Sequence, residues 1–84
     1  MENEIPGLSP GSVDKAHFDL LVRFARIRSE LIVIALQSYF VEGLSQRDVI
    51  ERYHIHQGLL SRKVGDIRKV SELVREAARY YSKG

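Results

Sequence analysis

The sequence predicts an all-α fold, a small bundle of four to five helices that contains a helix-turn-helix. Apolar residues recur at intervals of three and four along most of the 84-residue chain, which is the period of amphipathic helices. Both prolines lie within the first ten residues, so none interrupts this pattern. A chain of this length forms one domain and buries only about 60 to 65% of its unfolded surface. Self-association would bury more.

Residues 1–12 are expected to form an irregular N-terminal arm. This segment contains both prolines and two of the six glycines, residue types that interrupt regular structure. Residues 13–84 are expected to form a single helical domain.

The first predicted helix covers residues 13–27. Ser12 is a suitable N-cap, and Asp14 and Asp19 bring negative charge to the first turns, where it interacts favourably with the helix dipole. The residues expected on its apolar face are Val13, His17, Leu20, Leu21 and Phe24.

A second helix of about thirteen residues is predicted between Ser29, an N-cap candidate, and Gly43, which is placed to end a helix. Residues 31–36 are all apolar and, taken alone, fit a buried strand as well as a helix. The apolar run continues to Val41, which is too long for a typical strand. A helix that is apolar on most sides lies at the centre of a domain or in a subunit interface.

The third predicted helix, residues 45–53, has a well-marked start. Ser45 is the N-cap, and Asp48 completes a shorter version of the capping box. Leu44 and Val49 occupy the hydrophobic-staple positions on either side of the cap.

After a turn at residues 54–56, further helices are predicted over residues 57–70 and about 72–82. The last helix either continues the previous one or bends from it at Ser71. Its apolar stripe is expected to close the domain core, with dimer packing as the alternative. The stripe contains Val70, Leu73, Val74, Ala77, Tyr80 and Tyr81.

The segment of about residues 45–70 has the parts of a helix-turn-helix: a short capped helix, a turn and a basic second helix. At 100° per residue, Leu60, Val64 and Ile67 gather on one side of the second helix and supply its buried face. The opposite side is small, polar and cationic. It carries Gly58, Arg62, Gly65 and Lys69, with Ser61 and Arg68 on its flank.

Gly65 lies on this exposed side, inside the predicted helix. A glycine there costs about 1 kcal/mol of helix stability relative to alanine. Either the backbone approaches a partner closely at this point, or the glycine is a tolerated defect.

The charge is distributed unevenly between the halves of the chain. Residues 1–44 have a net charge of −2 and residues 45–84 a net charge of +4, in a chain with a pI near 9.2. A basic face on a small domain is typical of proteins that bind polyanions such as DNA. A solvated basic surface without a partner is the alternative.

Other classes of function lack their signatures. The chain has no cysteine, hence no disulfide framework and no thiolate zinc site. His54 and His56 have no convincing third metal ligand, and no phosphate-binding loop or nucleophile-and-base arrangement is present. We therefore expect no enzyme activity, no metal, no cofactor and no small-molecule substrate.

The N-terminus carries no signal-peptide pattern, since it is acidic and soon followed by a proline. The longest uncharged apolar segment, residues 31–41, is shorter than the roughly 20 residues that a membrane helix needs. A cytoplasmic protein without a membrane partner is expected.

Residues 44–64 resemble the helix-turn-helix of bacterial transcription regulators and sigma-like factors. Two residues depart from that pattern: Ile50 stands where a small alanine is usual, and His54 where a glycine usually makes the turn. From residue 10 to residue 81 the chain resembles the PapB-type regulators of bacterial fimbrial (adhesin biosynthesis) operons. The motifs are Pro10-Gly11-Ser12, His17-Phe18 before a leucine pair, Tyr39 with Gly43, Glu51-x-Tyr53, Gly58-x-x-Ser61 and Tyr80-Tyr81.

This resemblance implies a small helical transcription regulator that binds AT-rich repeats of duplex DNA near fimbrial genes as a homo-dimer or higher oligomer, associated with the nucleoid. It places DNA contacts on the second helix of the helix-turn-helix, at Gln57, Gly58, Ser61, Arg62, Gly65 and Lys69. A protein-interaction module without direct DNA readout is the alternative function.

Physical arguments add roles for the basic residues. Arg62 is expected to enter a groove, either at a guanine edge or in a narrow AT-rich minor groove. Lys63, Arg68 and Lys69 are expected to hold phosphates. Arg47, near the positive N-terminus of its helix, is expected to clamp the DNA backbone. The predicted oligomer interface contains Phe18, Leu21, Phe24, Leu31 and Ile34.

Overall fold

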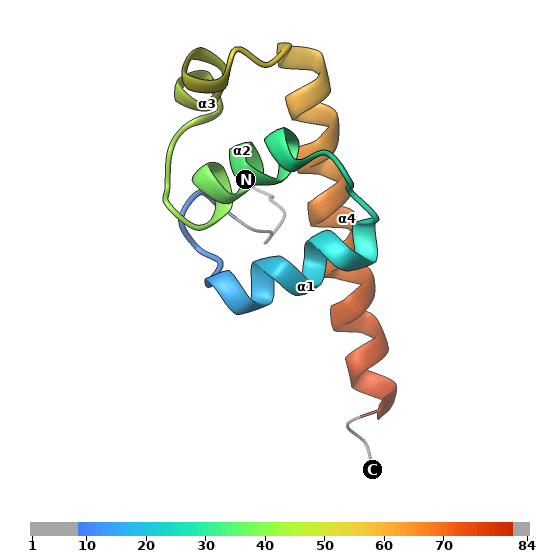
Figure 1. The fold of residues 1–84 in the computed structure, drawn as a ribbon. Helices are drawn as coiled ribbons and strands as arrows, with labels where there is room; N and C mark the ends of the chain where they lie inside the picture. The colour runs from blue at the N-terminus through green and yellow to red at the C-terminus, as the bar shows by residue number, and fades with distance from the viewer. Residues whose placement is uncertain (1–8, 82–84) are drawn as a thin grey trace, which may run out of the picture.

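Four helices form the described part of the chain, and the prediction of an all-α fold is confirmed. The computed structural model describes residues 9–81. The helices are α1 (Lys15–Ala25), α2 (Glu30–Phe40), α3 (Gln46–Tyr53) and α4 (Gln57–Tyr81). Figure 1 shows α1, α2 and α3 stacked along one side of α4. The two helices predicted after residue 56 are one continuous helix of 25 residues.

Side-chain N-caps start the first three helices. Ser29 accepts from the backbone N–H of Ile32, and Ser45 accepts from that of Asp48, both as predicted. The predicted cap at Ser12 is wrong: Asp14 is the N-cap of α1, and its carboxylate accepts from the His17 N–H. The Ser12 hydroxyl donates instead to the carbonyl of Ser9. Helix α1 therefore begins two residues later than predicted.

Residues 9–13 are not helical and pair with the end of α2. The N–H of Gly11 donates to the Tyr39 carbonyl over 3.0 Å, and that of Val13 donates to the Phe40 carbonyl over 3.1 Å. These bonds satisfy carbonyls that a helix C-terminus leaves without intrahelical donors. Gly11, at φ +74°, also lies against Gly43, so close that a Cβ added to Gly11 would be 3.2 Å from the Gly43 Cα. Residues 1–8 of the predicted arm lie outside the described residues.

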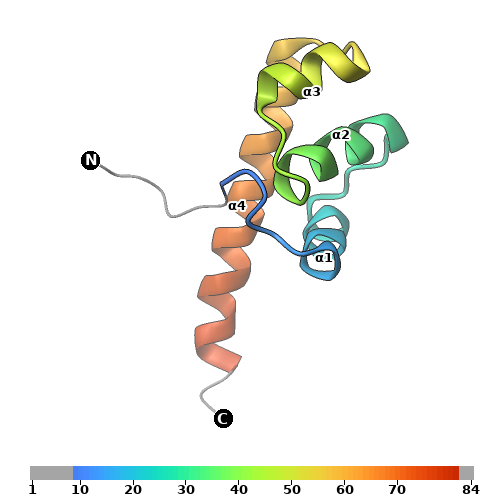
Figure 2. The same ribbon diagram turned by 90° about the vertical axis from the view of Figure 1, so that its left-hand side faces the viewer.

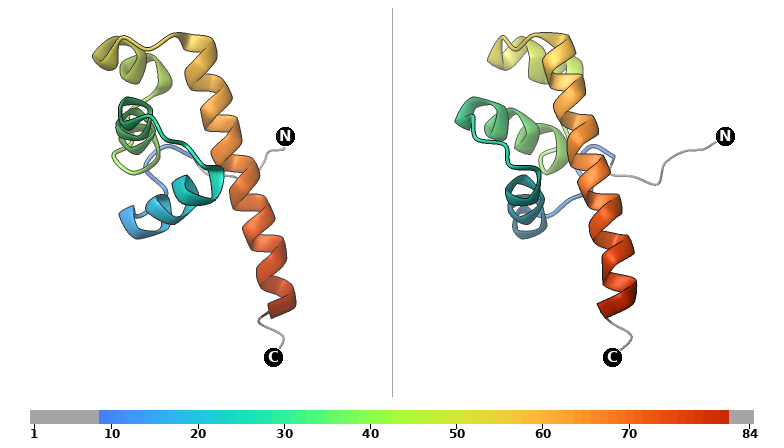
Figure 3. Two further views of the ribbon diagram at one scale, coloured as in Figure 1. Left: turned by 45° about the vertical axis from the view of Figure 1, so that its right-hand side comes forward. Right: turned by 90° about the vertical axis from the view of Figure 1, so that its right-hand side faces the viewer.

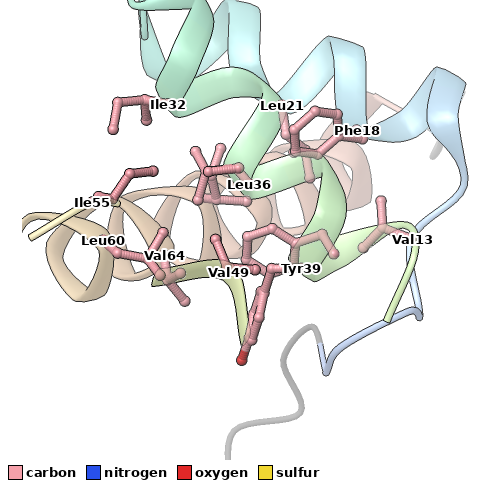
Figure 4. Close-up of a cluster of buried hydrophobic side chains, with 13 residues drawn as sticks. Val13, Phe18, Leu21, Ile32, Leu36, Tyr39, Val49, Ile55, Leu60 and Val64 are labelled. Atoms are coloured by element: carbon pink, nitrogen blue, oxygen red, sulfur yellow. The ribbon is translucent and has the colours of Figure 1, made fainter. Parts of the chain in front are cut away.

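Helix α2 lies at the centre of the core. It contacts the three other helices, and its side chains point toward those of α1, α3 and α4 in Figure 4. The Phe40 ring packs edge-on against Tyr39, with their centroids 4.8 Å apart. The buried apolar side chains of the core are Val13, Phe18, Leu21, Ile32, Ala35, Leu36, Tyr39, Phe40, Val49, Ile55, Leu60, Val64 and Ile67.

The predicted apolar face of α1 is partly wrong. Phe18 and Leu21 are fully buried, whereas Leu20 and Phe24 are exposed and so is His17. The apolar residues of α1 form two neighbouring stripes, and the core covers the one that contains Phe18 and Leu21. The other stripe, with Leu20 and Phe24 one turn apart, faces away from it.

The two halves of α4 differ in their packing. Leu60, Val64 and Ile67 are buried, as predicted, and Ser71 ends the buried stripe. Beyond Ser71 the helix extends past α1 and away from the other helices (Figures 2 and 3). The predicted core-closing stripe is only partly confirmed: Val70 packs against the core and Val74 is half-buried, whereas Leu73, Tyr80 and Tyr81 are exposed. No helix in the described part of the chain combines the length and the apolar character needed to cross a membrane.

Candidate nucleic-acid interface

Helices α3 and α4 form the predicted helix-turn-helix, and His54 makes its turn. His54 adopts a left-handed conformation at φ 55° and ψ 47°, and its N–H donates to the Ile50 carbonyl. This is the conformation that a glycine would adopt at lower cost. The next residue, Ile55, is buried in the core. The turn therefore forms although residue 54 is a histidine and not the usual glycine.

The start of α4 is capped by His56. Its carbonyl accepts from the Leu60 N–H, and its imidazole Nδ1 accepts from the Gly58 N–H over 3.0 Å. A Cβ on residue 58 would lie 3.3 Å from that imidazole, so the lack of a side chain at Gly58 leaves room for the His56 ring. Among residues 9–81 no group of three or more His, Asp or Glu side chains could hold a metal ion.

Helix α3 is held against the core by Val49 and Tyr53. Val49 is fully buried. The Tyr53 Oη lies 2.7 Å from the Oγ of Ser38, a buried polar group of α2. This bond satisfies a hydroxyl that would otherwise be costly to bury, and it fixes the end of α3 just before the turn.

The exposed ridge of α4 consists of Gly58, Arg62, Gly65 and Lys69, all of which are exposed. It lies opposite the buried stripe, as the helical period predicted. A Cβ added to Gly65 would meet nothing within 4 Å, so packing among residues 9–81 does not explain this glycine. The ridge thus combines two cations with an open backbone surface that a partner could approach closely.

The remaining predicted DNA contacts surround this ridge. Gln57 and Ser61 are exposed on α4, and Arg47 is exposed at the second position of α3. Lys63 is half-buried, with its Nζ 4.0 Å from an Asp66 carboxylate oxygen, a separation at which the ion pair is weak.

Arg68 has a structural role that the sequence did not predict. It is half-buried, and its Nη2 donates to the Tyr39 Oη over 2.9 Å. The bond links α4 to α2 across 29 residues of sequence. Gln46 was also absent from the predicted site, yet its Oε1 accepts from the Ser61 hydroxyl.

The structure corrects the predicted oligomer interface. Phe18 and Leu21 cannot contact a partner in this fold, because both are fully buried within one chain. Phe24, Leu31 and Ile34 remain exposed, at 57%, 48% and 50%. Phe24 also lines an apolar groove between α1 and the C-terminal half of α4. The apolar groove is lined by Phe24, Val70, Leu73, Val74, Ala77, Ala78 and Tyr81.

Comparison with known proteins finds a family model that matches most of the chain. The family model described as adhesin biosynthesis transcription regulatory protein, PapB, matches residues 1–81. Two regulatory proteins of Escherichia coli are similar. The major pilus subunit operon regulatory protein PapB is 33% identical over 89% of this chain and 72% of its own length. Regulatory protein FanB is 39% identical over 76% of this chain and 65% of its own length.

A solved structure shares the fold. The crystal structure of E. coli FocB superposes with a TM-score of 0.84 at 35% sequence identity, over 89% of this chain and 85% of that one.

Proposed function

The chain belongs to the PapB family of adhesin biosynthesis transcription regulatory proteins, and from this premise we propose that it binds duplex DNA through the exposed ridge of α4. It is a transcription regulator of the kind that controls fimbrial operons. The observation that carries the proposed DNA site is the open, cationic ridge directly opposite the buried stripe of the same helix.

Arg62 is the proposed central contact. It projects from the ridge one turn after Gly58 and just before Gly65. A guanidinium can donate two hydrogen bonds to a guanine edge or insert into a narrow, AT-rich minor groove. The proposed target is an AT-rich duplex, which favours the second mode.

Lys69 of the ridge and Lys63 beside it hold phosphates in this proposal. Lys63 and Lys69 supply affinity that depends on salt and not on base sequence. Arg47 contacts the backbone from the N-terminal end of α3, where the helix dipole also favours a phosphate. Arg68 ties α4 to Tyr39, and its charge adds to the positive potential of this face.

Titration of duplex DNA tests the proposal. The protein is titrated against an AT-rich and a GC-rich duplex at about 50 mM and about 200 mM salt, a range over which several phosphate contacts cost orders of magnitude in affinity. We expect tighter binding to the AT-rich duplex and a steep loss at the higher salt. If neither duplex binds at low salt, the protein-interaction module becomes the better explanation.

We also propose that the protein acts on DNA as an oligomer, with a second copy against the apolar groove. Leu31, Ile34 and Leu73 are large apolar side chains that are about half exposed. A surface with several such side chains is typical of an interface, whereas single scattered ones are normal on a monomer. The groove is lined by Phe24 and by residues between 70 and 81 of α4, whereas the exposed ridge lies between residues 58 and 69, so in this proposal a second copy in the groove leaves the ridge accessible.

Sedimentation of the wild-type chain and Leu73→Asp tests this contact. Leu73 is 59% exposed, so its replacement should leave the helix content unchanged while weakening association roughly tenfold or more, because a buried charge at an interface is costly. A monomer at high micromolar concentration, both free and on DNA with several sites, would contradict the oligomer.

The remaining assignments follow from a role in transcription. We place the protein in the bacterial cytoplasm, associated with the nucleoid, and we assign it no catalytic activity, cofactor, membrane or small-molecule partner. The family is a regulatory one.

A further inference from the structure

One side-chain hydrogen bond joins the two helices of the helix-turn-helix on their exposed side. The Ser61 hydroxyl in α4 donates to Oε1 of Gln46, the first residue of α3, over 3.1 Å. Ser61 is exposed and Gln46 is half-buried. Water competes for both groups, so the bond contributes little to the free energy of unfolding. Its main effect is to orient the Gln46 side chain.

The oriented amide retains unused donors. A glutamine carries an acceptor oxygen and an NH₂ group with two donors. Ser61 occupies the oxygen, and within residues 9–81 the Nε2 of Gln46 has no hydrogen-bond partner. The side chain is therefore held in one direction with two donors available for acceptors outside the chain.

These donors lie beside the proposed DNA surface. Ser61 is the chain neighbour of Arg62 and lies one turn before Gly65. Gln46 precedes the exposed Arg47 at the N-terminus of α3, where the helix dipole is positive. Duplex DNA presents acceptors to such a group, both as phosphate oxygens and on base edges.

We propose that Gln46 contacts DNA through its NH₂ group and that Ser61 is a positioning residue that holds this amide, without contacting DNA itself. The proposal rests on the proposed function, because it needs the α3–α4 face to bind a duplex. It adds one contact residue and changes the role of Ser61 from reading to positioning.

A double-mutant cycle separates the two roles. Gln46→Ala, Ser61→Ala and the double variant are titrated against the duplex that the wild-type chain binds. We expect a roughly tenfold loss for Gln46→Ala, the size of a good polar contact, and a roughly threefold loss for Ser61→Ala. The double variant should bind no more weakly than Gln46→Ala, since Ser61 acts only through Gln46. Additive losses in the double variant would overturn the positioning role.

Gln46→Glu tests the donors directly. It keeps the length of the side chain and an oxygen for Ser61, but it replaces the NH₂ donors with a negatively charged oxygen. We expect a larger loss of affinity than for Gln46→Ala. Gln37→Glu on α2, also at a half-buried amide, controls for the change in net charge and should lose less. Wild-type affinity in Gln46→Glu would overturn the contact.

Two further readouts complete the test. Helix content and melting temperature should be nearly unchanged in Gln46→Ala and Ser61→Ala, because the bond is exposed. Titration of Gln46→Ala with random and cognate duplexes identifies the acceptor of the Gln46 NH₂ group. Equal losses of affinity on both duplexes indicate a phosphate, and a loss on the cognate duplex alone indicates a base edge. Either result supports the contact. A wild-type chain that binds no duplex contradicts the proposed function itself, whereas tight wild-type binding with an unchanged Gln46→Ala contradicts only this inference.

Discussion

The two halves of α4 are continuous in backbone but differ in their surroundings. From Gln57 to Ser71 the apolar side faces the core and the polar side is exposed. From residue 72 onward most of the apolar side chains are themselves exposed, with Tyr81 at 83%, and Val74 is half-buried. Both halves are amphipathic, so amphipathicity alone does not decide burial.

In the proposed function, this difference separates DNA binding from self-association along one helix. The N-terminal half is fixed by its own core, which holds the exposed ridge at a defined angle to α3. In the C-terminal half, the other described residues leave most of the apolar side uncovered, which suits the proposed contact with another copy. One straight helix would then connect the DNA-binding face to the assembly face.

The largest expected effect is on stability. Leu60→Ala should lower the free energy of unfolding by about 2 to 5 kcal/mol, because Leu60 is fully buried and the truncation leaves a cavity. Leu73→Ala, the matched change in the other half, should stay within about 0.5 kcal/mol at an exposed site. Urea denaturation of dilute protein measures both. Equal losses would mean that the two halves are packed alike.

The next effect is on DNA affinity. Arg62→Ala should cost about 1 to 3 kcal/mol of specific binding with a nearly unchanged melting temperature. Arg79→Ala removes an exposed arginine from the C-terminal half and should cost much less. Titration with an AT-rich duplex provides the comparison, and similar losses in the two variants would show that the ridge is not the centre of the DNA site.

At Gly65 of the ridge, smaller effects of opposite direction are expected on stability and on DNA affinity. Gly65→Ala should raise stability by about 0.5 to 1 kcal/mol, because alanine favours the helix and its Cβ meets nothing within 4 Å. If DNA approaches the backbone there, affinity should fall severalfold in the same variant. Gly58→Ala is the control for stability: its Cβ would crowd the His56 imidazole, so it should gain less. Unchanged affinity in Gly65→Ala would favour a tolerated glycine.

The smallest effect concerns phosphate contacts. Lys69→Ala should weaken binding to specific and random duplexes by similar factors and lower the salt slope by about one unit. Arg75→Ala, in the other half of α4, should leave the slope unchanged. A loss confined to the specific duplex would mean that α4 lies along the groove, with Lys69 reaching base edges.

Local chemistry made much of the fold predictable. The caps at Ser29 and Ser45 depend on residues within one turn, and the sequence identifies both. Ser12 and Asp14 are equally good cap residues by type, and the choice depends on a distant partner, since the Val13 N–H bonds to the Phe40 carbonyl. The sequence around the start of α1 does not by itself reveal such a distant hydrogen-bond partner.

The buried faces show the same limit. Between Leu60 and Ile67, α4 has one apolar stripe, so its period identifies the buried side. Helix α1 has two, and periodicity cannot tell whether Leu21 or Phe24 meets the core. The C-terminal half of α4 has a regular stripe that the other described residues leave mostly uncovered, which only the assembled fold reveals.

The exposed ridge was predictable because it lies opposite a buried stripe. The roles of Arg68 and Gln46 were not, because their partners are Tyr39 and Ser61, which are distant in sequence. An amide at the first position of a capped helix, before an arginine, was the available signal for Gln46, and it is a weak one.

The scarcity of buried side chains in α3 has a consequence for local opening. Of the eight residues of α3, only Val49 is buried. Side-chain hydrogen bonds also connect α3 to its neighbours, from Tyr53 to α2 and from Gln46 to α4. Elements with few buried contacts open with a lower free energy than the whole domain. Amide hydrogens of α3 should therefore exchange with solvent sooner than those near Val64 in α4, and a bound duplex that contacts both helices should slow that exchange.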